Sequence, residues 1–207
     1  VILSYLAARP GLEALYPGRP MDQDSFVQLM CQIWDYVTPR EHGLHQPSMF
    51  QEGVRAFGNS RGVPLDPRVL EIPAARTHRP SFGEVSAFLR SSLERDCPVA
   101  FLNLSNGKVS DLDRWHWVTI IGMDGPMVHI LDSGREFPID LALWHETTKK
   151  RGGFVAVLPA ASEGGEPTAC VTDGGESDEK SGAGTLEAGC GVGDPAQPDR
   201  VCTHGGG

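Results

Sequence analysis

The hydrophobic pattern changes its period near Pro98, and this change limits the fold class more than any other feature of the chain. Before Pro98, apolar residues recur at the three- and four-residue spacing of amphipathic helices. After it, short apolar runs follow one another between turn residues, which is typical of β-strands. Helices first and strands afterwards predict an α+β domain, with N-terminal helices followed by an antiparallel sheet.

The apolar spacing predicts the end of a helix over residues 1–8 and further helices over residues 24–37, 48–57 and 81–94. Asp22 or Asp24 can cap the second of these. Its expected buried face consists of Phe26, Val27, Met30, Ile33, Trp34 and Val37. Ser81 and Glu84 have the spacing of a capping box, which predicts where the last of the four helices begins.

Strands are expected over residues 98–104, 117–122, 127–131 and 153–158. The segment Met123-Asp-Gly-Pro126 is a tight-turn signal that joins the second and third strands into a hairpin. A short helix over residues 140–147 is expected between the last strands. No internal repeat is evident.

The composition changes sharply near Leu158 and Pro159. Every Phe, Trp and Tyr precedes this point, whereas residues 160–207 hold nine acidic and two basic residues, about −7 of the formal charge of −9. A segment of this kind buries too little apolar surface to offset its ordering entropy. We therefore expect one domain over residues 1–159, long enough for a hydrophobic core, and a disordered acidic, Gly-rich tail over residues 160–207.

Several classes of site and partner are not expected. Lys and Arg form no extended basic stretch, so nucleic acid is not an expected partner. There is no CxxC pair and the His residues lack metal-ligand spacing, so neither a metal site nor a cofactor is expected. No apolar run is long enough to span a membrane.

The chain begins with Val1 inside an apolar pattern, so we expect it to start within a longer protein. A targeting signal would then lie upstream of Val1. Cys31 and Cys97 alone precede the change in composition, and two cysteines do not indicate a disulfide framework. A cytoplasmic location is therefore slightly favoured, while the oligomeric state stays open.

The candidate chemistry lies in residues 115–134. His116 opens one predicted hairpin strand and Asp132 ends its partner. With Met123 facing Pro126, His116 would lie opposite residue 133, one step from Asp132, and a one-residue bulge would set Asp132 directly across. In either register the carboxylate can fix the tautomer of the imidazole and leave its other nitrogen for a thiolate.

An ordinary structural role is the alternative for each residue taken singly. His116 would then be a strand-end histidine, and Asp132 a turn residue before Ser-Gly. Their ordered pairing across one hairpin favours the catalytic interpretation. Structural or solvent-facing roles are expected for the other histidines of the domain, namely His42, His45, His78, His129 and His145. Trp115 and Trp117 are either core aromatics or walls of a cleft beside His116.

The segment His116-Trp-Val-Thr-Ile-Ile-Gly122, followed by Ile130-Leu-Asp-Ser-Gly134, resembles the His and Asp boxes of a family of papain-like cysteine peptidases. This is the bacteriocin-processing, double-glycine leader peptidase-like family, and the resemblance covers residues 1–158. It implies a papain-like fold that acts on a peptide or protein substrate without a cofactor. It also implies His116 as general base and ion-pair partner, with Asp132 orienting it.

The same resemblance implies a nucleophilic Cys at the start of an N-terminal helix, with an oxyanion-hole Gln a few residues earlier. Residues 1–8 resemble the end of that helix, so both would lie upstream of Val1. Cys31 lies mid-helix and Cys97 precedes a strand, and neither position favours a reactive thiolate. Three functions stay open: a peptidase completed by an upstream Cys, an inactive peptide-binding module, and an acyltransferase on the same fold.

Overall fold

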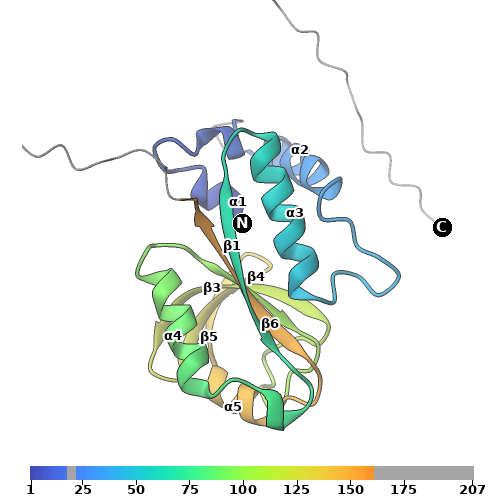
Figure 1. Cartoon of the computed structure of the whole chain (residues 1–207), viewed down its shortest axis with the longest axis vertical. Coiled ribbons are helices and arrows are strands. Elements are labelled where there is room, and N and C mark those ends of the chain that lie inside the picture. The colour runs from blue at the N-terminus through green and yellow to red at the C-terminus, as the bar shows by residue number, and fades with distance from the viewer. Residues whose placement is uncertain (18–21, 161–207) are drawn as a thin grey trace, which may run out of the picture. The chain divides into compact units, whose positions relative to one another are not determined.

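The structure is a computed structural model that describes residues 1–17 and 22–160 (Figure 1). The helical elements are α1 (Ile2–Leu6), η1 (Glu13–Leu15), α2 (Gln23–Trp34), α3 (Pro47–Ser60), η2 (Arg76–His78), α4 (Phe82–Leu93) and α5 (Leu141–Thr147). The strands are β1 (Leu65–Ile72), β2 (Val99–Asn103), β3 (His116–Asp124), β4 (Met127–Asp132), β5 (Arg135–Asp140) and β6 (Gly152–Pro159).

The six strands form one antiparallel sheet in the order β1-β6-β2-β3-β4-β5. Successive side chains of β6 alternate between two separate cores, with Val155 and Val157 in one and Phe154 and Ala156 in the other. Figure 1 shows α3 and α4 on opposite sides of the strands. The sheet is thus a middle layer with helices on both faces, and the predicted α+β class is confirmed.

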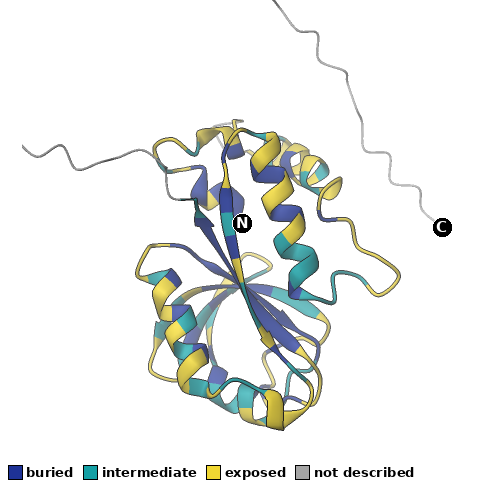
Figure 2. Cartoon of the chain, viewed as in Figure 1, coloured by how far each residue is buried: buried dark blue, intermediate teal, exposed yellow. Residues whose placement is uncertain are grey.

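The first core lies between the sheet and the N-terminal helices. It joins Leu6 of α1 and Phe57 of α3 to Val155 of β6, and all three side chains are fully buried. Burying an apolar side chain of this size contributes about 1.5–3 kcal/mol. Figure 2 shows buried residues in dark blue along the strands and in bands on the helices. This core therefore fixes α1 and α3 against one face of the sheet.

The second core lies under α4 and α5. Ser81 and Glu84 form the predicted capping box at the start of α4. Three buried aromatic rings then pack together, because Phe101 lies 4.6 Å from Trp144 and 5.0 Å from Phe154 between ring centroids. These contacts hold α5 against the face of the sheet opposite the first core.

The predicted helices and the four predicted strands are present, with ends that differ by a few residues. The sequence pattern did not reveal β1 and β5, which contain Pro67 and Pro138. These two strands are the edges of the sheet. A proline weakens a strand signal because it cannot donate to the ladder, yet an edge strand tolerates it.

The expected buried face of this helical segment is only partly correct. Val37 is buried and Phe26 and Ile33 are half-buried. Val27, Met30 and Trp34 are instead 50%, 56% and 58% exposed, and Leu29 is the buried residue of α2. Because α1 and α3 already cover the adjoining face of the sheet, α2 contacts the core only along a narrow strip centred on Leu29. Asp22 caps this helix by accepting a hydrogen bond from the Ser25 amide at 2.7 Å, as one of the two predicted caps.

The predicted tail over residues 160–207 lies outside the described residues except for Ala160. The amide of Ala160 donates to the carbonyl of Pro64 at 3.1 Å, which extends the pairing of β6 with β1 by one step. In the part of the chain that the structure describes, no helix has the length and apolar character that crossing a membrane requires.

Candidate active site

The β3–β4 hairpin positions both candidate catalytic residues, in a register that the sequence did not predict. It closes with Asp124 opposite Met127, and a shift near Ile121 then sets Ile120 opposite Ile130. Continuing this ladder brings Asp132 opposite Val118, so neither expected register is correct. The difference arises at the turn, where Gly125 adopts a φ of +57° and allows a two-residue loop.

His116 and Asp132 nevertheless meet. His116 lies two residues before Val118, so its side chain is on the same face as that of Asp132 and reaches it diagonally. The distance from His116 Nε2 to Asp132 Oδ1 is 2.8 Å. The imidazole is 36% exposed and the carboxyl group 16% exposed, so a substrate can reach the ring while its partner is shielded.

The electrostatics of Asp132 favour an ionised carboxylate. Burial alone would raise the pKa of this carboxyl group, but hydrogen bonds from His116 and Ser133 and nearby positive charge hold the pKa below its ordinary value. Since a carboxylate only accepts hydrogen bonds, Nε2 of His116 must carry the proton that joins them. Nδ1 of His116 has no hydrogen-bond partner among residues 1–17 and 22–160.

Asn103 is a further residue of the site, and the sequence reasoning missed it. It lies opposite His116 on β2 and is fully buried. Its Nδ2 donates to the carbonyl of Asp113, and its Oδ1 accepts from Trp144 Nε1 at 3.1 Å. A polar residue at the end of the apolar run 98–102 was the available signal. Asn103 thereby ties the loop before His116 to the second core.

Trp117 joins the site to the N-terminal helices. Its Nε1 donates to the carbonyl of Leu44 at 2.7 Å, and its ring stacks on Phe50 with centroids 5.0 Å apart. Trp117 was expected to be either a core aromatic or a wall of a cleft, and the structure shows it packed against α3 and the loop before it. The residue that follows His116 is therefore held in place by these contacts.

Trp115 differs from Trp117. Its side chain is 56% exposed and its φ is +57°, a left-handed conformation that is uncommon for a bulky residue. The ammonium group of Lys150 lies 4.4 Å from the centroid of its ring, within the range of a cation–π interaction. An exposed, conformationally strained aromatic thus stands immediately before His116.

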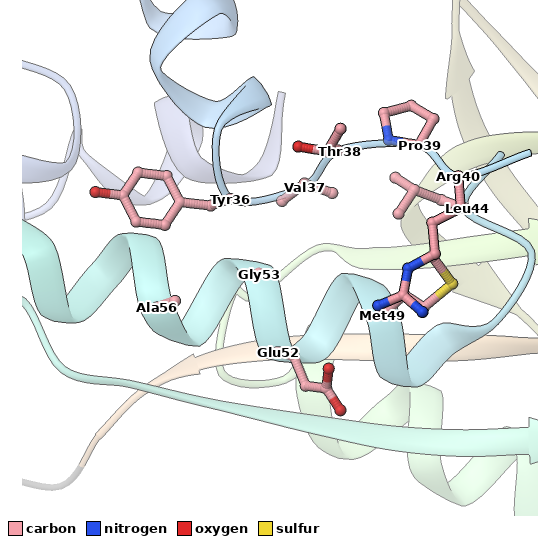
Figure 3. Close-up of a pocket in the computed structure, with 10 residues that line it drawn as sticks. All are labelled: Tyr36, Val37, Thr38, Pro39, Arg40, Leu44, Met49, Glu52, Gly53 and Ala56. Atoms are coloured by element: carbon pink, nitrogen blue, oxygen red, sulfur yellow. The ribbon is translucent and has the colours of Figure 1, made fainter.

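A cavity of about 480 Å³ lies between α3 and the loop that precedes it (Figure 3). Arg40 and Glu52 bring opposite charges to its lining, and Tyr36 lies at one end of the labelled set. Leu44 also lines it, and the hydrogen bond from Trp117 to Leu44 links it to β3. No residue of β3 or β4 lines the cavity, so it is a neighbour of the candidate site rather than part of it.

The described cysteines do not complete the site. Cys97 is buried and precedes β2, at the opposite end of that strand from Asn103. Six residues of extended chain separate the two, which is about 20 Å. Cys31 lies inside α2, as expected from the sequence. Neither occupies a helix N-terminus beside His116.

The other histidines have separate surroundings. His129 Nδ1 lies 3.5 Å from Glu136 Oε1 in an exposed pair, and His145 Nε2 lies 2.9 Å from the carbonyl of Pro80. Burial is the main cause that lowers the pKa of His145. Within residues 1–17 and 22–160, no three His, Cys, Asp or Glu side chains are grouped so that they could hold a metal ion.

No protein-family model matches the chain, and no curated protein or solved structure matches it either. A function is therefore proposed from the residues around His116 and from the resemblance of the two sequence boxes.

Proposed function

We propose that this is a papain-like cysteine peptidase domain of the bacteriocin-processing type, in which His116 and Asp132 are two members of a Cys-His-Asp triad. The observation that carries the proposal is the 2.8 Å contact between Asp132 and Nε2 of His116, which leaves Nδ1 available for a thiol. The partly exposed ring and the ionised carboxylate are the properties that a general base and its orienting group need.

In the proposed reaction, Nδ1 of His116 takes the proton of the thiol and the thiolate attacks the carbonyl carbon of a peptide bond. A carbon–sulfur bond forms, and backbone amides with the upstream Gln stabilise the oxyanion. The imidazolium then protonates the leaving amine as the carbon–nitrogen bond breaks. Water, deprotonated by His116, hydrolyses the thioester and restores the thiol. Asp132 holds the ring and stabilises its protonated form throughout.

The nucleophile is proposed to lie on a segment that precedes Val1. Arg9, just after α1, donates to Asp96 Oδ2 at 2.9 Å, so the C-terminal end of α1 lies beside the start of β2. Trp117, the residue after His116, packs against the same core as α1. This shared core supports a nucleophile carried by a segment that continues α1 before Val1.

The test uses the full polypeptide encoded by the gene, including the residues before Val1. It would be treated with an iodoacetamide-type probe at neutral pH, and the labelled cysteines identified by peptide mapping. We expect one Cys before Val1 to label fastest, and His116→Ala to slow that labelling by about 100-fold, the scale of general-base assistance. His129→Ala is the matched control, since His129 pairs with Glu136 on the same sheet; this variant should label like the wild type.

The absence of such a Cys, or labelling that ignores His116→Ala, would overturn the peptidase proposal in favour of a peptide-binding module. Acyl transfer would be recognised with one acyl donor, supplied with and without an added amine. Incorporation of the amine in place of hydrolysis would assign transferase chemistry to the same residues.

A further inference from the structure

Two loops gather five positively charged side chains at the end of the sheet that carries His116. They belong to the β2–β3 loop and to the α5–β6 loop, and we call them the cationic rim: Lys108, Arg114, Lys149, Lys150 and Arg151. The Lys108 amide donates to Thr147 Oγ1 at 2.9 Å, and Thr148 Oγ1 donates to the carbonyl of Ser105 at 3.1 Å. These bonds hold the two loops together.

The strand pairing sets the distance from the rim to His116. Asn103 lies opposite both His116 on β3 and Gly152 on β6, so these residues stand in one row across three strands. Two interstrand spacings amount to about 10 Å. Arg151 directly precedes Gly152, and Lys150 contacts Trp115, the neighbour of His116. The rim therefore lies about three residues of extended peptide from the imidazole.

Within residues 1–17 and 22–160, the rim carries more positive than negative charge. All five side chains are exposed, and among the described residues no salt bridge joins any of them to a carboxylate. The acidic residues of the same region are Asp111, Asp113 and Glu71, whose carboxylate interacts with Arg151, and they are fewer than the five cations. A local excess of positive charge beside His116 is notable because the whole chain carries a formal charge of −9.

Trp115 adds an apolar surface to this charge. Its exposed ring carries Lys150 near one face, so an aromatic surface and an ammonium group are presented together. The methylene groups of Glu can pack on such a ring while the carboxylate pairs with the cations. The left-handed backbone at Trp115 has a conformational cost, and strained residues of this kind concentrate at functional sites.

We propose that the cationic rim and Trp115 bind an acidic side chain of the peptide substrate, placed about three residues from the bond that is cleaved. This inference rests on the proposed function for the identity of that bond. A nucleic acid fits less well. Asp111 and Asp113 would repel a continuous row of phosphates, and in the part of the chain that the structure describes Trp115 is the one exposed ring beside the rim, too few for successive bases to stack on.

The test measures fluorescence anisotropy of a labelled ten-residue peptide with three Glu residues, and of the same peptide with Gln in their place, on the full 207-residue chain. We expect the acidic peptide to bind about tenfold more tightly at low salt, with the difference shrinking as salt is added. The double variant Lys150→Gln/Arg151→Gln should remove this preference. Arg55→Gln/Arg90→Gln is the matched control, because both residues are exposed on helices, and it should keep the preference.

Circular dichroism of each variant confirms that it is folded. Equal binding of the two peptides, or loss of the preference in the control variant as well, would overturn the inference. Tighter binding of a single-stranded oligonucleotide than of the acidic peptide would replace it with nucleic-acid binding. If the protein prefers the acidic peptide but His116→Ala labels as fast as the wild type, only the peptidase proposal fails. If His116→Ala slows labelling but the two peptides bind equally, only the proposed role of the cationic rim fails.

Discussion

Asn103 lies directly opposite His116 in the β2–β3 ladder, and its buried amide is shared between the loop before His116 and α5. The donor end bonds the carbonyl of Asp113 and the acceptor end bonds the indole of Trp144. A buried polar group that loses its hydrogen-bond partner still bears the full free-energy cost of desolvation. Both bonds of Asn103 are therefore favoured together, and they link the position of His116 to the packing of the second core.

Asn103→Ala should therefore lower the free energy of unfolding by about 1–3 kcal/mol, since the Asp113 carbonyl loses this partner and the Trp144 indole keeps its 2.8 Å bond to the carbonyl of Ser105. Urea denaturation measures the change. Asn59→Ala is the control, because Asn59 is exposed near the end of α3, and its effect should stay within about 0.5 kcal/mol. Equal stability of Asn103→Ala and the wild type would show that the amide bonds do not support the site.

The stability contributed by Asp132 should depend on pH. Burial raises the pKa of its carboxyl group, but the hydrogen bonds from His116 and Ser133 together with nearby positive charge outweigh burial, so the folded-state pKa is below that of the unfolded chain. The contribution is complete above the unfolded pKa of about 4 and is lost as the pH falls through the lower, folded value. The stability difference between wild type and Asp132→Asn should thus be largest at neutral pH and shrink below pH 4.

Denaturant titrations between pH 7 and pH 3 would measure this difference. Asp124→Asn is the matched control, because Asp124 is an exposed carboxylate at the other end of the same hairpin. The Asp124→Asn difference should vary much less with pH. A pH-independent difference for Asp132→Asn would contradict the hydrogen-bonded carboxylate described for the site.

Trp117→Phe should loosen the loop before α3 without removing the aromatic contact with Phe50. The substitution deletes the hydrogen bond to the carbonyl of Leu44, worth about 1 kcal/mol, so amide exchange over residues 38–46 should rise about fivefold. Hydrogen–deuterium exchange with mass spectrometry reads this directly. Trp34→Phe, at an exposed position on α2, should leave the same segment unchanged. Unaltered exchange in Trp117→Phe would show that packing alone holds the loop.

Gly152→Ala should destabilise the domain because a Cβ there would lie 2.6 Å from the carbonyl oxygen of Leu102 and 3.0 Å from the ring of Trp144. Overpacking of this kind costs about 1–3 kcal/mol and should appear as a lower Tm. Gly122→Ala offers the comparison, since the nearest atom to its Cβ is His129 Cβ at an ordinary 3.7 Å. A Gly152→Ala protein as stable as Gly122→Ala would mean that β6 can shift away from β2.

Several features of the fold could be predicted from the sequence because their causes are local. The capping box of Ser81 and Glu84 lies within one helical turn, and the hairpin turn at Gly125 lies within four residues. The change of hydrophobic period near Pro98 likewise separates helices from strands without knowledge of their partners. These features set the α+β class and placed His116 and Asp132 on neighbouring strands.

Other features were missed because their causes are not local. Pro67 and Pro138 hid two strands, since their tolerance depends on an edge position that only the strand order creates. The exposed face of α2 depends on how much of the sheet α1 and α3 already cover. The hairpin register depends on a shift near Ile121, which changes which residue faces Asp132.

By itself, then, the sequence determined two things. The period of its apolar residues determined the class of the fold, and the positions of His116 and Asp132 on consecutive predicted strands determined their choice as a pair. Tertiary structure decided the contact at Nε2, the buried bonds of Asn103 and the cationic rim. The run Lys149-Lys150-Arg151 was visible in the sequence, but its place beside His116 was not. That place follows from β2 lying between β3 and β6, and strand order is set by long-range packing that no local pattern encodes.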